Sequence, residues 1–194
     1  MVTLREFIDG LCSKPSRAKD WMEMRRDLRD PICVEAPNIE LSIRWADKAD
    51  LLILSAMQGF VKGEDFLDRS IEKGDRFLLL EDGGRICAFA WVAFRDYPLD
   101  LLHTLHLDPG AAYLVYIFVM PALQRKGVGL YLLSSLMLRL SERGYHTLVS
   151  GMFEDWQVSI RLHLKAGFQI TRRFQKRRIL RIIPYPPKVI QVEE

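Results

Sequence analysis

The stretch VMPALQRKGVG, residues 119–129, decides how the rest of the chain is interpreted. It leaves an apolar, strand-like run at Val119, turns at Pro121 and enters a predicted helix through a basic loop that contains Gly127 and Gly129. Glycines lack Cβ obstruction, and the first N–H groups of a helix have no partner within it and sit at its positive end. Such a loop binds a phosphate or pyrophosphate group, although the same glycines also suit an ordinary strand-to-helix turn.

The neighbouring elements are predicted from hydrophobic pattern and glycine stops. The sequence lacks both GxxxxGK[ST] and GxGxxG, which excludes the two commonest nucleotide-binding loops. AAYLVYIFVM at 111–120 predicts a buried strand, and the apolar segment 127–143 predicts a helix that ends at a glycine. A strand at 146–153 and a second glycine-ended helix at 156–166 follow.

The remaining elements complete a mixed topology. They are a strand at 39–46, helices at 48–60 and 64–73, strands at 76–82 and 86–94 joined by a tight turn at Asp82-Gly83-Gly84, and strands at 168–174 and 177–183 before a proline-rich tail. The order is β-α-α-β-β-β-α-β-α-β-β. It predicts an α+β or three-layer αβα fold, with a mixed, mostly antiparallel central sheet flanked by helices.

Two segments stand apart from this pattern. SRAKDWMEMRRDLRD at 16–30 predicts an amphipathic helix, so we interpret residues 1–37 as an N-terminal helical extension and 38–194 as the main domain. The segment 95–110 is long and leucine-rich, and we expect an irregular functional loop there. We expect this loop and the extension to wall the pocket of a second substrate.

Composition limits the class of protein. The 194 residues carry a net charge of +3 and three scattered cysteines, which do not indicate a disulfide framework or a zinc ribbon. No apolar run of membrane-spanning length and no signal-peptide pattern is found, so we expect a cytoplasmic protein. Six basic residues lie in 172–181 and suit a solvated face or an acidic ligand, while nucleic acid is a minor interpretation. The sequence leaves open whether the protein forms a homodimer.

The basic loop resembles a known signature. The pattern V-x-P-x-x-Q-R-K-G-V-G is similar to the acetyl-CoA motif, Q/R-x-x-G-x-G/A, of the GNAT superfamily of N-acetyltransferases. A second stretch, QVSIRLHLKAGF at 157–168, resembles the later N-x-S-x-x-L-Y-x-K-x-G-F helix of that family. The resemblance covers about residues 39–183 and implies a GNAT-like acyl-CoA N-acyltransferase fold. It also implies transfer of an acetyl group from acetyl-CoA to an unidentified primary amine, by direct attack in a ternary complex and without a metal.

The resemblance further implies a cofactor site. Backbone groups at the end of the strand 111–120 would run beside the pantetheine arm, and N–H groups of the basic loop would hold the pyrophosphate. The frequent asparagine of the later helix is a glutamine here. The implied cofactor-binding residues are Ile117, Phe118, Val119, Gln124, Arg125, Lys126, Gly127, Val128, Gly129 and Gln157.

Two departures concern the catalytic residues. His163 stands where the family often has a tyrosine that protonates the departing thiolate, and a histidine can also serve as that general acid. Tyr113 stands where many members have a glutamate, and a phenol with a pKa near ~10 is a poor base. The long loop offers further candidate bases, and a metal site on its histidines is disfavoured. These candidates are Asp100, His103, His106 and Asp108.

Two alternatives accompany the acetyltransferase hypothesis. The absence of a glutamate at Tyr113 suits a non-catalytic acyl-CoA-binding regulatory module. A longer acyl group would suit the apolar side chains of the loop, which would then line an acyl channel. These side chains are Tyr97, Leu99, Leu101, Leu102, Leu105 and Leu107.

Overall fold

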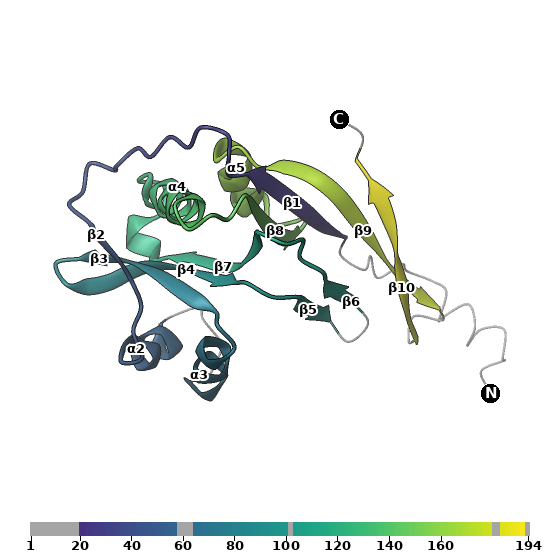
Figure 1. Ribbon diagram of the computed structural model, residues 1–194, viewed down its shortest axis with the longest axis horizontal. Helices are drawn as coiled ribbons and strands as arrows, with labels where there is room; N and C mark the ends of the chain where they lie inside the picture. Colours follow the sequence, from purple (N-terminus) through teal and green to yellow (C-terminus); the bar gives the residue numbers. More distant parts are fainter. Residues whose placement is uncertain (1–19, 58–63, 101–102, 180–182, 193–194) are drawn as a thin grey trace, which may run out of the picture.

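Eight strands form one mixed sheet in the part of the chain that the computed structural model describes, residues 20–57, 64–100, 103–179 and 183–192 (Figure 1). Their order across the sheet is β10-β9-β1-β8-β7-β4-β3-β2, and β7 runs parallel to β8 while the other described neighbours are antiparallel. The strands are β1 (Trp21–Asp27), β2 (Ser42–Trp45), β3 (Arg76–Asp82), β4 (Arg85–Ala93), β7 (Ala111–Val119), β8 (Thr147–Phe153), β9 (Gln169–Ile179) and β10 (Ile183–Gln191).

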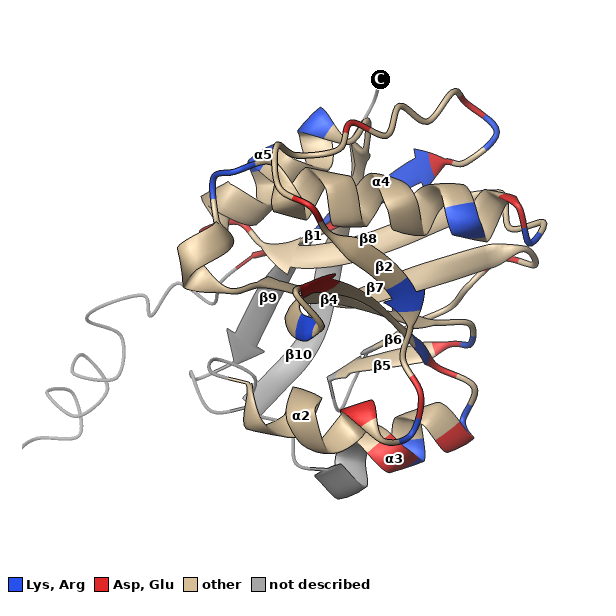
Figure 2. Cartoon of the chain, turned by 90° about the vertical axis from the view of Figure 1, so that its left-hand side faces the viewer, with Lys and Arg blue, Asp and Glu red and all other residues tan. Residues whose placement is uncertain are grey.

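Helices cover both faces of this sheet (Figure 2). α4 (Val128–Ser141) and α5 (Gln157–Lys165) lie on one face, and α2 (Asp50–Ala56) and α3 (Glu64–Glu72) lie on the other. Leu132, Leu133, Leu136 and Leu140 of α4 are buried in the main core cluster. Phe77, Phe89 and Trp91 centre a second cluster toward α2. The three-layer arrangement around a mostly antiparallel sheet confirms the predicted fold class.

The tight turn predicted at Asp82-Gly83-Gly84 is confirmed, between β3 and β4. Asp82 pairs with Arg85, and the two glycines between them have φ values of 56° and 79°. Positive φ at both central residues matches the right-handed twist of a hairpin, and glycine adopts it without a Cβ penalty. The helix predicted at 48–60 is present as α2, Asp50–Ala56, while residues 58–60 lie outside the described residues. Asp47 Oδ1 accepts the N–H of Ala49 just before it, at 2.8 Å.

The predicted helix at 16–30 is wrong where the structure describes it. Trp21–Asp27 form β1, which lies between β8 and β9 and is hydrogen-bonded to both. Good helix formers such as Met, Glu and Arg gave the sequence its helical pattern, but pairing on two edges overrides so weak a preference. Residues 21–27 therefore belong to the main sheet and not to a helical extension, and residues 1–19 lie outside the described residues.

A buried carboxylate holds β1 in place. Glu23 is fully buried, and its Oε1 accepts hydrogen bonds from Arg25 Nε at 2.8 Å and from Thr171 Oγ1 at 3.1 Å. Arg172 Nη1 lies 3.7 Å from the other carboxylate oxygen. Because a buried charge is tolerated only with partners, this cluster ties β1 to β9.

The C-terminal prediction needs two corrections. Gln169–Ile179 form one continuous strand, β9, which joins the strand expected at 168–174 to the first residues of that expected at 177–183. Residues 180–182 lie outside the described residues, and Ile183 begins β10, which includes the proline-rich tail. β10 lies at the edge of the sheet, which is where prolines are tolerated in strands because they cannot donate to the ladder. β9 and β10 extend together away from the body of the molecule (Figure 1).

The long segment 95–110 is more regular than expected. Within it, β5 (Tyr97–Asp100) and β6 (His103–Leu105) form a two-stranded hairpin. Tyr97, Leu99, Leu105 and Leu107 belong to or pack against a core cluster with Tyr113. These described side chains therefore cover the sheet, while Leu101 and Leu102 lie outside the described residues.

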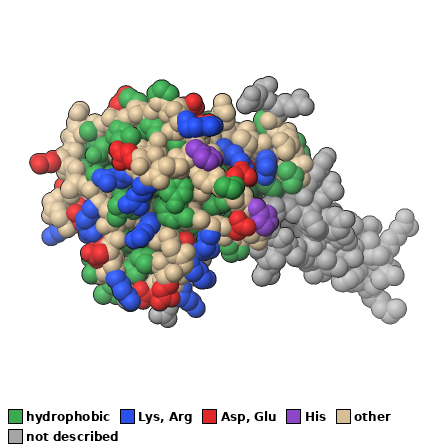
Figure 3. All heavy atoms as spheres, viewed as in Figure 1, with side chains coloured by type: hydrophobic (Ala, Val, Ile, Leu, Met, Phe, Trp, Pro, Cys, Tyr) green, Lys and Arg blue, Asp and Glu red, His purple; other side chains and the backbone are tan. Residues whose placement is uncertain are grey.

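The surface carries both signs of charge. On the face seen in Figure 3, Lys and Arg side chains lie among acidic and apolar ones. In the basic segment, Arg172 lies near Glu23 and Arg173 pairs with Glu154 at 2.7 Å, so part of its charge is neutralised. In the described part of the chain, no helix combines the length and apolar character needed to cross a membrane.

Candidate active site

The central feature of the site is an opening in the sheet between β7 and β8. The two strands pair from Ala111 opposite Thr147 to Leu114 opposite Ser150, and no described pair continues beyond that point. The pairing of β7 with β4 skips Val115, which forms a β-bulge there. A bulge bends its strand and increases the local twist, so the bulge explains why β7 leaves β8 at this position.

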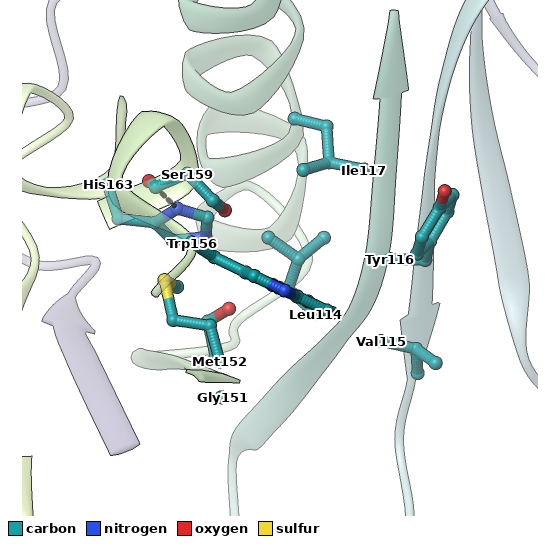
Figure 4. Close-up of a pocket in the computed structure, with 10 residues that line it drawn as sticks. Leu114, Val115, Tyr116, Ile117, Gly151, Met152, Trp156, Ser159 and His163 are labelled. Carbon is teal, nitrogen blue, oxygen red and sulfur yellow. Dashed lines mark hydrogen bonds between the residues drawn. The ribbon is translucent and has the colours of Figure 1, made fainter. Parts of the chain in front are cut away.

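A cavity of about 280 Å³ occupies this opening. In Figure 4, Leu114 and Ile117 point from β7 toward α5, and His163 faces them. The cavity is therefore bounded by one wall from each separated strand and one from the helix. Its lining residues are Leu114, Val115, Tyr116, Ile117, Ser150, Gly151, Met152, Trp156, Ser159 and His163.

His163 is the most unusual polar group in this lining. Its side chain is buried, and its Nδ1 lies 2.8 Å from the carbonyl oxygen of Ser159 (Figure 4). A carbonyl oxygen only accepts, so Nδ1 carries a proton and donates it. The other ring nitrogen, Nε2, is buried without a hydrogen-bond partner among the described residues.

This geometry modifies the predicted role of His163. Burial lowers the pKa of the imidazole, with only a smaller opposing effect from the Ser159 carbonyl. The ring is therefore neutral near pH 7, and Nε2 presents a lone pair rather than a proton. His163 is placed to accept a proton or a hydrogen bond first, and it becomes a proton donor only after that.

Tyr113 does not line the cavity, contrary to its proposed catalytic role. It is buried against Tyr97, with ring centroids 5.0 Å apart, in the cluster on the other face of the sheet. Burial strongly raises the pKa of its hydroxyl, which leaves the phenol protonated. Tyr116, on the far side of the bulge, is among the lining residues and was missed by sequence reasoning, but its ring points away from His163 and packs against Phe89 (Figure 4).

The basic loop has the backbone conformation of an anion cradle. Arg125 has a φ of 61° and Gly127, which precedes the first residue of α4, has a φ of 82°. A non-glycine residue in the left-handed region is strained, and such strain is typical of functional loops. Residues 124–127 are exposed, and the first N–H groups of α4 point out of its N-terminus beside them. Two cationic side chains, Arg125 and Lys126, complete the cradle.

The glycines of this loop play different roles. A Cβ at Gly127 would meet Pro37 at an ordinary 3.8 Å, so its positive φ is what requires glycine. Gly129 has no such φ, and a Cβ there would lie 3.5 Å from Leu162 and 3.6 Å from Val119. Gly129 therefore allows close packing of α4 against β7 and α5, with room for little more than a methyl group.

Ile117, Phe118 and Val119 lie on the part of β7 that is not paired with β8. They pair with β4 on one edge, while no described residue pairs with their other edge. That edge leads from the cavity toward the basic loop, where Gln124 Nε2 donates to Val119 O at 3.0 Å. An extended polar chain can hydrogen-bond to such an edge as an added strand.

The other predicted site residues lie away from the cavity. Gln157 Nε2 donates to Glu154 O at 2.7 Å, and Gln157 is not among the lining residues. His106 Nδ1 lies 2.6 Å from Asp96, and Asp108 pairs with Arg25 at 2.9 Å. The side chains of Asp100 and His103 lie outside the described residues. Among the described residues, no group of His, Cys, Asp and Glu is arranged to hold a metal ion.

Comparison with known proteins identifies the family. The profile of the acetyltransferase (GNAT) family matches residues 44–168. An L-methionine sulfoximine/L-methionine sulfone acetyltransferase from Salmonella typhimurium is 26% identical over 151 residues, which are 68% of this chain and 81% of that protein.

Solved structures share the fold. A GCN5-related N-acetyltransferase from Sphaerobacter thermophilus superposes with a TM-score of 0.59 at 16% identity, over 80% of this chain and 49% of the other. AAC(6')-Iy in complex with the bisubstrate analogue CoA-S-monomethyl-acetylneamine superposes with a TM-score of 0.52 at 18% identity, over 72% and 95% of the two chains. The chain spans between 48% and 61% of the length of three of its structural relatives. The profile match covers more than half of the chain, which therefore belongs to the acetyltransferase (GNAT) family.

Proposed function

We propose that the protein is an N-acetyltransferase that moves the acetyl group of acetyl-CoA to a primary amine by direct attack in a ternary complex. The observation that carries the proposal is the open edge of β7. This edge joins a cavity at its bulge to a cationic cradle at its C-terminal end. An acyl-CoA has the matching order of parts, a thioester, an extended amide-bearing arm and a pyrophosphate.

The cofactor residues act mainly through their backbone. The N–H groups at the start of α4, with Arg125 and Lys126, would hold the pyrophosphate. The open edge at Ile117–Val119 would pair with the amides of the pantetheine arm. Held in this way, the thioester would lie in the cavity, where positioning lowers the barrier to attack.

The reaction needs one proton to be moved. The amine nitrogen forms a bond to the carbonyl carbon, the C–S bond breaks, the nitrogen loses a proton and the sulfur gains one. In the resting protein, His163 Nε2 is unprotonated and can accept the proton that the amine loses. The protonated ring can then donate this proton to the departing thiolate, and we assign His163 this transfer. This replaces a simple general-acid role, because the resting ring has no proton to donate at Nε2.

The acceptor class is proposed from the curated relative. That protein acts on L-methionine sulfoximine and L-methionine sulfone, which are α-amino acids with a polar side chain. The cavity, at about 280 Å³, is of a size for a small group together with the acyl end of the cofactor. We therefore place small α-amino acids first among the amines to test.

One observation favours a non-catalytic acyl-CoA-binding module. None of the ten described residues that line the cavity is Asp or Glu, so the site lacks the carboxylate base that many family members carry. The observation against it is His163, which lines the cavity with an Nε2 that has no hydrogen-bond partner among the described residues. A longer acyl donor has less support, because the loop residues Tyr97, Leu99, Leu105 and Leu107 do not line the cavity.

The test combines binding and turnover. Acetyl-CoA is titrated into the protein by calorimetry, and release of the CoA thiol is followed over a panel of amino acids, amines and peptides, with a longer acyl-CoA as a second donor. Binding with amine-dependent thiol release is the expected result. Binding without turnover on any amine supports the module, and the absence of binding rejects both functions.

A further inference from the structure

A second cavity, of about 260 Å³, lies between the C-terminal end of α3 and the start of the β5–β6 hairpin. Both elements lie on the face of the sheet opposite α4 and α5 (Figure 2). None of the described residues that line it also lines the cavity at the bulge of β7, so the two cavities are distinct. We call it the basic pocket, and its lining residues are Arg69, Ser70, Lys73, Arg95, Tyr97 and Pro98.

The lining of the basic pocket is positively charged. Arg69, Lys73 and Arg95 belong to it, and no Asp or Glu is among the described residues that form it. Lys73 N donates to Arg69 O at 3.2 Å, so the helical turn continues to Lys73 and places the two exposed side chains on the same side of α3. Arg95 reaches the pocket from the opposite wall. Cations gathered around one space repel each other, and an anion bound between them removes that repulsion.

The end of α3 is built so that an anion can approach it. Gly74 has a φ of 92°, and its N–H donates to Ile71 O at 2.8 Å. Asp75 N donates to Ser70 O at 3.0 Å, which completes a Schellman motif. Unpaired carbonyl oxygens at a helix C-terminus disfavour an anion, but here these last carbonyls already accept backbone N–H groups.

The guanidinium of Arg95 is incompletely hydrogen-bonded. Its Nη2 lies 3.3 Å from the carboxylate of buried Asp75, which also accepts Trp91 Nε1 at 3.0 Å. Its Nη1 lies 3.4 Å from Asp96 O, and its Nε is buried without a hydrogen-bond partner in the part of the chain that the structure describes. Charge-assisted hydrogen bonds are commonly about 2.7–2.9 Å long, so Arg95 retains capacity for a stronger acceptor.

We propose that the basic pocket binds a phosphate group, as inorganic phosphate or as the phosphate of a small ester. A phosphate carries several charged oxygens in a tetrahedral arrangement, which suits three cations that reach it from two walls. The pocket has room for several water-sized groups of ~30 Å³ each, and Tyr97 and Pro98 give it a less polar wall beside the cations. An ester would therefore fill more of the pocket than the free ion. The site is separate from acetyl transfer and does not rest on the proposed function.

Phosphorus NMR line broadening of inorganic phosphate and of glycerol phosphate, with the full-length protein in a chloride buffer, measures the binding. Both probes should bind, more weakly as salt is added, and acetate should not displace them. Tighter binding of glycerol phosphate identifies an ester as the ligand, and equal affinities identify the free ion. Displacement by an equal concentration of acetate would contradict recognition of a phosphate.

Substitutions in the lining test the location of the site. Lys73→Ala and Arg69→Ala should each raise the Kd for glycerol phosphate roughly threefold to tenfold through loss of one charge-assisted contact. Arg95→Lys should also weaken binding, because it keeps a cation beside Asp75 but loses the planar fork. Lys48→Ala is the matched control, since it removes an exposed cation that pairs with α3 outside the lining, and it should change the Kd less than about twofold.

The cradle at the start of α4 is the competing site for a phosphate. A chain with both Arg125→Ala and Lys126→Ala should still bind glycerol phosphate, and adding Lys73→Ala to it should weaken that binding as in the parent. Circular dichroism checks that each variant is folded. No binding to the parent, binding that disappears in the double variant, or an equal loss in Lys48→Ala and Lys73→Ala would overturn the basic pocket as a phosphate site.

Discussion

The two edges of β8 differ in a way that separates stability from chemistry. On one edge, β1 pairs with β8 along its whole length, from Trp21 opposite Phe153 to Asp27 opposite Thr147. On the other edge, pairing with β7 stops at Leu114 opposite Ser150, and the cavity begins. β8 is therefore fully paired with β1, which we call the closed edge, and only partly paired with β7, which we call the open edge.

Specific residues produce each behaviour. On the closed edge, the Trp21 indole lies so close to Gly151 that a Cβ there would be 1.8 Å from it, and Glu23 is buried with its cationic partners. On the open edge, the bulge at Val115 bends β7 away and the cradle follows at its end. We expect changes on the closed edge to reduce stability and changes on the open edge to reduce binding or rate.

The largest effect should come from Glu23→Ala. The substitution removes a buried carboxylate and leaves the Arg25 guanidinium without its closest partner, at an expected loss of about 3 kcal/mol or more in the free energy of unfolding. Urea denaturation followed by circular dichroism measures it. Arg29→Ala, in an exposed pair with Asp27, is the control and should leave the midpoint unchanged. A Glu23 variant as stable as the parent would show that β1 is not held by this cluster.

His163→Phe should have the next largest effect, and on rate rather than stability. Loss of the proton-carrying Nε2 should lower kcat by ~10²-fold or more, with a much smaller change in the KM for acetyl-CoA. His163→Tyr should recover part of the rate, because the family often has tyrosine at this position. His106→Phe, at an exposed histidine outside the cavity, is the control. Equal kcat in the Phe variant would leave His163 with a structural role only.

Gly151→Ala should destabilise the closed edge. The added methyl group would overlap the Trp21 ring, and overpacking of this kind costs about 1–3 kcal/mol. Combining it with Trp21→Leu should give a smaller loss than the sum of the two single changes, because the clash disappears. Strict additivity in thermal or urea unfolding would argue that the two residues do not meet.

Gly127→Val and Gly129→Ala should separate conformation from packing in the cradle. Valine at Gly127 has to adopt a left-handed backbone at a cost of about 1–2 kcal/mol, so acetyl-CoA affinity should fall roughly tenfold as the loop relaxes. Alanine at Gly129 makes only ordinary contacts and should change affinity less than about twofold. Calorimetry on both variants measures this, and equal effects would contradict the assigned difference.

The smallest effect concerns pH. Because burial lowers the pKa of His163, the unfolded chain binds more protons than the folded one between that lowered pKa and ~6.5. Stability should therefore fall as the pH falls through this window, by at most ~1.4 kcal/mol per pH unit, and His163→Phe should remove that dependence. The acidic limb of kcat/KM should lie below pH ~6.5 for the same reason. An acidic limb above that value would contradict a neutral resting histidine.

The cradle and the helix that carries His163 were predictable because their signals are local. A glycine with positive φ, a helix start and a neighbouring basic pair all lie within residues 124–129. The place of β1 was not predictable, because its partners lie more than 100 residues away in the sequence. The local composition of residues 21–27 favours a helix, but hydrogen bonding to β8 and β9 makes this segment a strand.

The position of Tyr113 outside the cavity lining has a geometric cause. In a regular strand, Tyr113, Ile117 and Val119 would share one face, since side chains alternate with a period of two. The bulge at Val115 inserts one residue, so Tyr113 faces the cluster with Tyr97 while Ile117 and Val119 face the α4 side. The same shift turns the ring of Tyr116 away from His163 and against Phe89, with ring centroids 5.9 Å apart (Figure 4). A bulge within an apolar run leaves no clear signal in the sequence, so it was not predictable. The tautomer of His163 was not predictable either, because it depends on the hydrogen bond of Nδ1 to the Ser159 carbonyl.

A crystal structure of the protein with bound coenzyme A tests the central claim most directly. We predict that the pyrophosphate lies on the N–H groups of residues 124–129 and that the pantetheine arm lies along the open edge of β7. The sulfur should then sit in the cavity, within about 3.5–4 Å of His163 Nε2, a hydrogen-bonding distance for sulfur. Coenzyme A bound elsewhere, or an arm that leaves this cavity empty, would contradict the account.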